Sequence, residues 1–149
     1  MPFSRRVALS LLAMVLAFAA SSCGRSHRIE WVSEANTYTL TQAGKLASSV
    51  DISDVSGTSA ADAPALRQEY LVSLRSHGEA AAALADHLTL DFPVDSASVP
   101  VRVESATVDG KPVWFVVEAW AEEDGTLTHR RMWLISRADF TVIGSSSYR

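Results

Sequence analysis

The spacing of apolar residues changes abruptly at Ser98, and this change constrains the fold more than any other feature of the sequence. Before Ser98, apolar residues recur three or four positions apart, as they do on one face of a helix. After it, apolar and polar residues alternate, which predicts half-buried strands. Asp-Gly pairs at 109–110 and 124–125 indicate hairpin turns. We therefore expect four strands, at about residues 98–107, 112–121, 127–136 and 140–146, forming an antiparallel meander.

Three helices are predicted before the strands. Thr39 and Gln42 form a capping box for a short helix over residues 40–50. Asp62 is the expected N-cap of a second helix, with Pro64 in its first turn. Its apolar stripe consists of Leu66, Tyr70, Leu71 and Leu74.

A third helix should follow after a very short joint. Ser76 and Glu79 have the spacing of a second capping box. This helix is expected to bury Ala80, Ala83, Leu84 and Leu88 and to end before Pro93. The predicted fold class is α+β: a helical hairpin, together with a short N-terminal helix, on one face of a four-stranded antiparallel meander sheet.

Side-chain alternation on the second predicted strand separates its two faces. Val113, Phe115, Val117 and Ala119 form a wholly apolar set, which we expect to meet the helices. A two-residue loop at 109–110 would pair Glu104 with Phe115 and put a carboxylate in the core. We therefore expect a three-residue loop that pairs Val103 with Phe115 and Val101 with Val117.

The length of the next loop predicts how the second and third strands pair and which residues share a surface. A two-residue loop at 124–125 pairs Val117 with Met132, Phe115 with Leu134 and Glu118 with Arg131. The opposite face of the sheet is then unusually rich in tryptophan for a solvated surface, and something should cover it. The candidate covers are the N-terminal segment with the residue 40–50 helix, a second copy of the chain, or a ligand. The candidate interaction residues are Trp114, Trp120, Trp133, Glu118, His129 and Arg131.

The N-terminus has the layout of a secretory signal peptide over residues 1–22. Arg5 and Arg6 precede an uncharged apolar run of 14 residues, at 7–20. As a helix this run covers about 21 Å, which is short for a bilayer core of roughly 30 Å. The segment SRRVALSL also resembles a twin-arginine export signal, so the export route stays open.

Cys23 is the single cysteine of the chain, and it follows Ala20-Ser21-Ser22. These four residues resemble the lipobox of bacterial lipoproteins. The resemblance implies cleavage before Cys23, a diacylglyceryl thioether on its sulfur, and an anchor on the extracytoplasmic face of the cell membrane. The alternative is cleavage at the A-x-A site at residues 17–19, which would give a secreted protein. Residues 23–36 are then expected to be a tether, and residues 37–149 a single domain.

The remaining pattern favours binding over catalysis. The sequence has no HExxH, G-x-S-x-G, phosphate loop or metal-spaced Cys/His cluster, so we expect no catalytic residue, metal or cofactor. Removal of residues 1–22 would change the net charge from −4 to −6. A chain with this charge gives no indication of the basic surface that binds nucleic acid. We expect a non-catalytic interaction module that holds an envelope protein or a second copy of itself. The alternative is a ligand-binding or enzymatic pocket near Glu118, His129 and Arg131.

Overall fold

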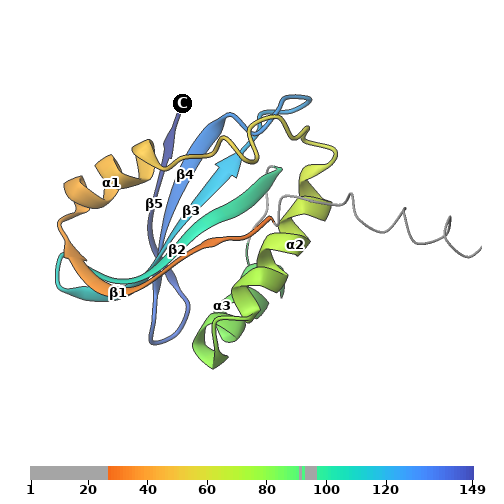
Figure 1. The fold of residues 1–149 in the computed structure, drawn as a ribbon. Helices are drawn as coiled ribbons and strands as arrows, with labels where there is room; N and C mark the ends of the chain where they lie inside the picture. The colour runs from red at the N-terminus through yellow and green to blue at the C-terminus, as the bar shows by residue number, and fades with distance from the viewer. Residues whose placement is uncertain (1–26, 91, 93–96) are drawn as a thin grey trace, which may run out of the picture.

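The computed structural model describes residues 27–90, 92 and 97–149. The predicted signal peptide and Cys23 therefore lie outside the described residues. In chain order the elements are β1 (Glu30–Tyr38), α1 (Leu40–Ser49), α2 (Ala63–Arg75), α3 (Glu79–Leu90), β2 (Ser98–Val108), β3 (Lys111–Trp120), β4 (His129–Ser136) and β5 (Val142–Tyr148). The helices cover both faces of one twisted sheet (Figure 1). Within the described part of the chain, no helix is long and apolar enough to cross a membrane.

The sheet has the strand order β1-β2-β3-β4-β5. Strands β2 to β5 form the antiparallel meander that the sequence predicted. The fifth strand, β1, pairs in parallel with β2 and corrects the prediction of a tether over residues 23–36. An edge strand with a register shift between Val32 and Asn36 has little apolar alternation, so its sequence resembles a linker. Trp31, within β1, packs against the core.

Helix α1 begins as its capping box predicted. The backbone N–H of Gln42 donates to the Thr39 hydroxyl at 3.2 Å, and the Thr39 N–H donates to the Gln42 side chain at 2.8 Å. Ala43 and Ala47 are buried. A side chain at Gly44 would meet the Tyr148 hydroxyl 2.9 Å from its Cβ, so glycine lets α1 approach β5 closely.

Helices α2 and α3 form the predicted hairpin, with two differences in detail. Ser76 caps the C-terminus of α2 instead of starting α3, and α3 begins at Glu79 after Gly78. The side chains that α3 buries are Ala81, Leu84, Ala85 and Leu88, so the predicted burial of Ala80 and Ala83 is wrong. Alanine occupies positions 80–83 and 85, and this run has no polar residue that would mark the solvent side.

The turn between β2 and β3 contradicts the predicted three-residue loop. Asp109 and Gly110 have φ angles of 46° and 79°, as in a two-residue type I′ turn. Glu104 therefore pairs with Phe115, and Val103 pairs with Val116. The carboxylate that argued against this register is fully buried, and hydrogen-bond donors surround it, as described below.

The register between β3 and β4 is confirmed. Val117 lies opposite Met132, Phe115 opposite Leu134, and Glu118 opposite Arg131. The connection is wider than a two-residue loop, because β3 ends at Trp120 and β4 begins at His129. The residues between them bond to a distant loop instead, for example from the Leu127 N–H to the Thr58 carbonyl at 3.0 Å.

The two faces of the sheet are covered in the opposite way to the prediction. The tryptophan-bearing face lies under the α2–α3 hairpin, since Arg67 of α2 reaches Glu118 of β3. The face that carries Phe115 and Val117 lies under α1, which packs against β4. Both faces are apolar enough to form a core, so apolar character alone did not distinguish them.

We expect Gly110→Ala to destabilise the domain by about 1–2 kcal/mol, because a side chain at positive φ clashes with its own backbone. Gly57→Ala is the matched control, since Gly57 has no positive φ and a Cβ added there would meet no atom within 4 Å. Chemical denaturation of both variants measures the difference. Equal unfolding free energies would contradict the turn assignment.

Candidate functional site

A buried ion pair lies at the centre of the tryptophan-bearing face. The Arg67 guanidinium, on α2, lies 2.7 Å from the Glu118 carboxylate, on β3. The two side chains are only 7% and 2% exposed. A buried ion pair is tolerated when its remaining donors and acceptors are also bonded.

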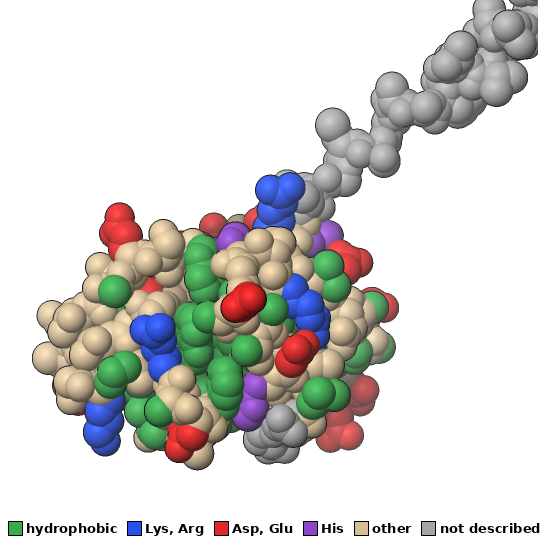
Figure 2. All heavy atoms as spheres, turned by 90° about the horizontal axis from the view of Figure 1, so that it is seen from below, with side chains coloured by type: hydrophobic (Ala, Val, Ile, Leu, Met, Phe, Trp, Pro, Cys, Tyr) green, Lys and Arg blue, Asp and Glu red, His purple; other side chains and the backbone are tan. Residues whose placement is uncertain are grey.

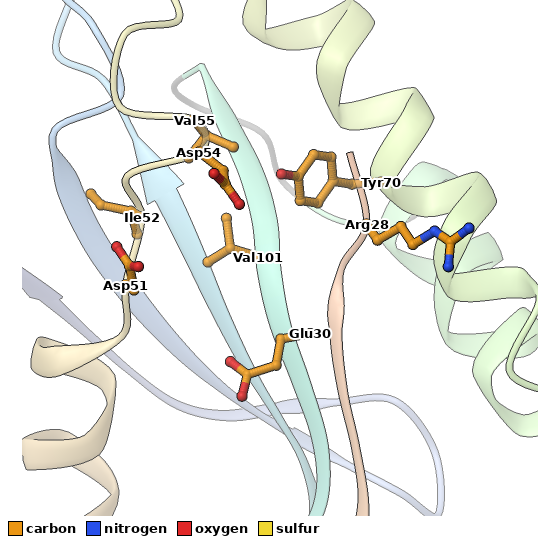
Figure 3. A pocket seen from close by; sticks show the side chains of 8 residues that line it. All are labelled: Arg28, Glu30, Asp51, Ile52, Asp54, Val55, Tyr70 and Val101. Carbon is orange, nitrogen blue, oxygen red and sulfur yellow. The ribbon is translucent and has the colours of Figure 1, made fainter. Parts of the chain in front are cut away.

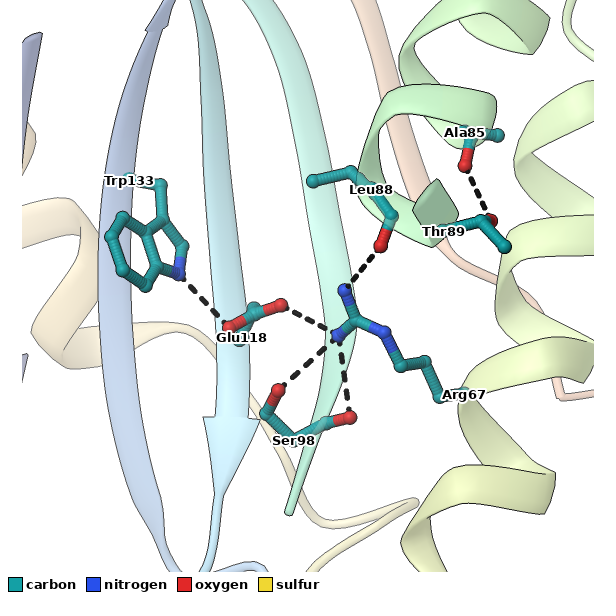
Figure 4. A network of polar contacts seen from close by, with 7 residues as sticks. All are labelled: Arg67, Ala85, Leu88, Thr89, Ser98, Glu118 and Trp133. Carbon is teal, nitrogen blue, oxygen red and sulfur yellow. Dashed lines mark hydrogen bonds and ion pairs between the residues drawn. The ribbon is translucent and has the colours of Figure 1, made fainter. Parts of the chain in front are cut away.

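Hydrogen bonds to residues of three further elements complete this pair (Figure 4). Arg67 donates to the Ser98 hydroxyl at 3.2 Å and to the Leu88 carbonyl at 3.1 Å. The Trp133 indole N–H donates to the second Glu118 oxygen at 2.9 Å. The network therefore joins α2 and α3 to β2, β3 and β4. Both carboxylate oxygens of Glu118 are engaged, which is the arrangement of a structural group.

Trp114 belongs to the interior. It is 4% exposed, and its ring centroid lies 5.9 Å from that of Trp31. Trp31 in turn stacks on His77 at the α2–α3 joint, at 5.1 Å. The chain's own β1 and helical hairpin thus cover this part of the predicted interaction face.

The other predicted residues form a half-buried row, which we call the aromatic row: Trp120, His129, Arg131 and Trp133. The Arg131 guanidinium lies 4.9 Å from the centroid of Trp120 and 5.5 Å from that of Trp133. Alternation along β4 puts residues 129, 131 and 133 on one face, and the confirmed register brings Trp120 opposite His129. Trp120 is fixed further by donating from its indole N–H to the Arg130 carbonyl, at 3.2 Å.

Apolar surface also remains where the sheet meets the helical hairpin. Viewed from below Figure 1, hydrophobic side chains form a band across the middle of the molecule, with charged side chains on both sides (Figure 2). The aromatic residues Trp31, Trp133 and Phe140 are only partly buried against the core. The domain therefore closes its tryptophan-bearing face incompletely.

A second buried carboxylate, Glu104, was not predicted as a site. It accepts hydrogen bonds from the Asn36 amide at 2.7 Å, the Tyr38 hydroxyl at 2.9 Å and Arg102 at 2.9 Å. Arg102 also pairs with Glu30. Burial raises the pKa of Tyr38, and its hydrogen bond to Glu104 raises it further. This cluster holds β1 against β2. The sequence feature that could have indicated it was Glu104, an acidic residue at a position that the two-residue loop places in the core.

The described ranges contain no assembled metal site. No group of three or more His, Cys, Asp or Glu side chains in 27–90, 92 and 97–149 is placed to hold a metal ion. His129 lies 3.8 Å from Glu122, and its ring centroid lies 4.9 Å from that of Trp120, with the ring planes tilted by 42°. Cys23 lies outside the described residues, so its predicted lipidation stays a prediction.

Comparison with protein families, curated proteins and solved structures finds no match to this chain.

We expect Glu118→Gln to destabilise the domain by about 3–5 kcal/mol, because it leaves the Arg67 charge buried without its counter-ion. Asp86→Asn is the matched control. It breaks the Arg75–Asp86 pair, whose Asp86 side chain is 61% exposed, and should cost less than about 1 kcal/mol. Urea denaturation measures both. A Glu118→Gln loss as small as the control's would show that the pair does not hold the hairpin.

Proposed function

We propose that this chain is a non-catalytic binding module of the bacterial cell envelope, anchored by lipid at Cys23, with the aromatic row as its binding surface. The observation that carries the proposal is the Arg131 guanidinium held between the rings of Trp120 and Trp133. Tryptophan and arginine supply much of the binding energy at protein interfaces. The contacts with the two rings already order the Arg131 guanidinium. A partner that binds there therefore causes a smaller loss of side-chain conformational entropy.

The charge around the row favours an acidic partner. His129 and Arg131 lie within the row, whereas the chain as a whole has a net charge of −4. A positive charge attracts carboxylates, and indole rings pack against apolar groups. We propose that the occupant is an acidic, partly apolar segment of another envelope protein. Two copies of an acidic chain would repel one another, which makes self-association the weaker option.

The anchor would hold the domain close to the bilayer. Because β1 begins at Glu30, only the seven residues 23–29 remain for the tether, half of the length expected from the sequence. Fully extended, they span at most about 25 Å. A lipid-anchored domain on so short a connection would meet partners at or near the membrane surface.

The alternative of a reactive pocket at Glu118, His129 and Arg131 has less support. Glu118 is buried and bonded through both oxygens, while His129 and Arg131 lie along the aromatic row. These contacts make Glu118 a scaffold residue and give a ligand no open carboxylate there.

We expect Cys23→Ala to release the protein from the membrane fraction and to abolish labelling with a fatty-acid analogue, since the thioether needs the sulfur. Cys23→Ser is a second variant that preserves size and polarity and should behave in the same way. Fractionation and metabolic labelling measure the result. Full membrane retention of both variants would refute the lipid anchor.

We expect Trp120→Ala to reduce crosslinking to an envelope partner by at least about tenfold while the domain stays folded, because it removes one ring from the Arg131 stack. Val72→Ala is the control: this apolar side chain is 63% exposed on α2, away from the row. Crosslinking in the native envelope, with the mass of the adduct, measures the effect. An adduct of twice the chain's mass, or unchanged crosslinking, would contradict the proposed partner.

A further inference from the structure

A cavity of about 220 Å³ lies away from the aromatic row, between the loop after α1, the middle of α2 and the start of β1. Its apolar lining consists of Ile52, Val55 and Val101, all of which are buried. Figure 3 shows the side chains of Glu30, Asp51 and Asp54 around the same space. The cavity thus has an apolar wall and several carboxylates.

The Tyr70 hydroxyl points into this cavity (Figure 3). Tyr70 is 3% exposed, and among the described residues its hydroxyl has no hydrogen-bond partner. Among the described residues, the only fully buried side-chain nitrogen or oxygen without a hydrogen bond is Arg102 Nε, so the Tyr70 hydroxyl is open to the cavity and can bond to a group placed there. Burial raises the pKa of Tyr70, and the charge of Asp54 adds to the effect, so the hydroxyl is neutral at pH 7. It has a lone pair to offer a donor in the cavity.

The charges that face the cavity are mainly negative. Glu30 is paired with Arg102, but Asp54 has no ion pair or hydrogen bond among the described residues. A hydrogen bond from the Ser53 N–H, at 2.9 Å, lowers the pKa of Asp51 and keeps it ionised. Arg28 also borders the cavity, but its guanidinium points away from the carboxylates, toward α2 (Figure 3).

The geometry favours an organic cation over a metal ion. The acidic side chains that line the cavity do not converge as metal ligands do, since the described residues contain no such group. An ammonium group instead needs separate acceptors for its three N–H bonds. Asp51, Asp54 and the Tyr70 oxygen provide acceptors, and the apolar wall suits a short hydrocarbon body.

We propose that this cavity binds a small organic ammonium ion, with its charge toward Asp54 and Tyr70 and its hydrocarbon part against Ile52, Val55 and Val101. A space of about 220 Å³ suits a small amine. The proposal is independent of the aromatic row and of the lipid anchor.

The test titrates the full chain, in an uncharged detergent, with n-butylammonium and follows the backbone amide NMR signals of residues 51–55. Butanol and butyrate are probes of similar size without the positive charge. Butylammonium should shift these signals, and both other probes should bind at least about tenfold more weakly. Butyrate or butanol binding as tightly as butylammonium would overturn the proposal.

Two variants locate the site. Asp54→Asn and Tyr70→Phe should each weaken butylammonium binding by about tenfold, whereas Glu123→Gln, an exposed carboxylate elsewhere, should leave it unchanged. Asp54 is exposed and Tyr70→Phe keeps the buried ring, so both variants should fold, as circular dichroism would show. Unchanged binding in both folded variants would also overturn the proposal.

Discussion

The structure depends on one buried ion pair, Arg67 with Glu118. Neither charge can reach water, so each must be bonded by the protein, and the available partners lie on several elements. Ser98, Leu88 and Trp133 supply them, which fixes α2 and α3 against β2, β3 and β4 at once. Because the hairpin has to sit where these bonds form, the pair also determines how much of the tryptophan-bearing face is covered.

The aromatic row follows from that placement. The hairpin and Trp31 bury Trp114, whereas Trp120 and Trp133 stay partly exposed. Arg131 then lies between two indole rings at a half-open part of the sheet. The Arg67–Glu118 pair positions the α2–α3 hairpin over the tryptophan-bearing face. The proposed binding surface is the part of that face that the hairpin leaves uncovered. On the opposite face α1 packs against β4, and the loop after α1 borders the proposed ammonium cavity.

Local signals in the sequence predicted the local structure well. The Thr39–Gln42 capping box located α1, because this signal acts within one helical turn. The start of α2 was also predicted correctly at Asp62 with Pro64 in the first turn, although the Asp62 side chain makes no capping hydrogen bond and instead accepts one from Ser59. The β3–β4 register was also predicted correctly from alternation, although the residues between the two strands do not form the expected two-residue loop. The same reasoning placed Trp120, His129, Arg131 and Trp133 on one face, but it could not tell which face the hairpin covers.

The failures involved contacts between distant residues. Glu104 seemed unsuited to the core because two of its partners, Asn36 and Tyr38, are 68 and 66 positions away. The same holds for Glu118, whose partner Arg67 is 51 positions away. Arg67 does precede Tyr70 and Leu71 by three and four positions, on the buried stripe of α2, so a charge within an apolar stripe was the available signal.

Hydrogen exchange at the Trp133 indole N–H, measured by NMR on the full chain, tests whether the Arg67–Glu118 pair holds the hairpin over the sheet. If it does, this proton should exchange slowly, and Arg67→Met should make it exchange fast. The Trp31 indole, whose N–H has no hydrogen-bond partner among the described residues, provides the fast reference. A Trp133 proton that exchanges as fast as that of Trp31 in the parent chain would contradict this role of the pair.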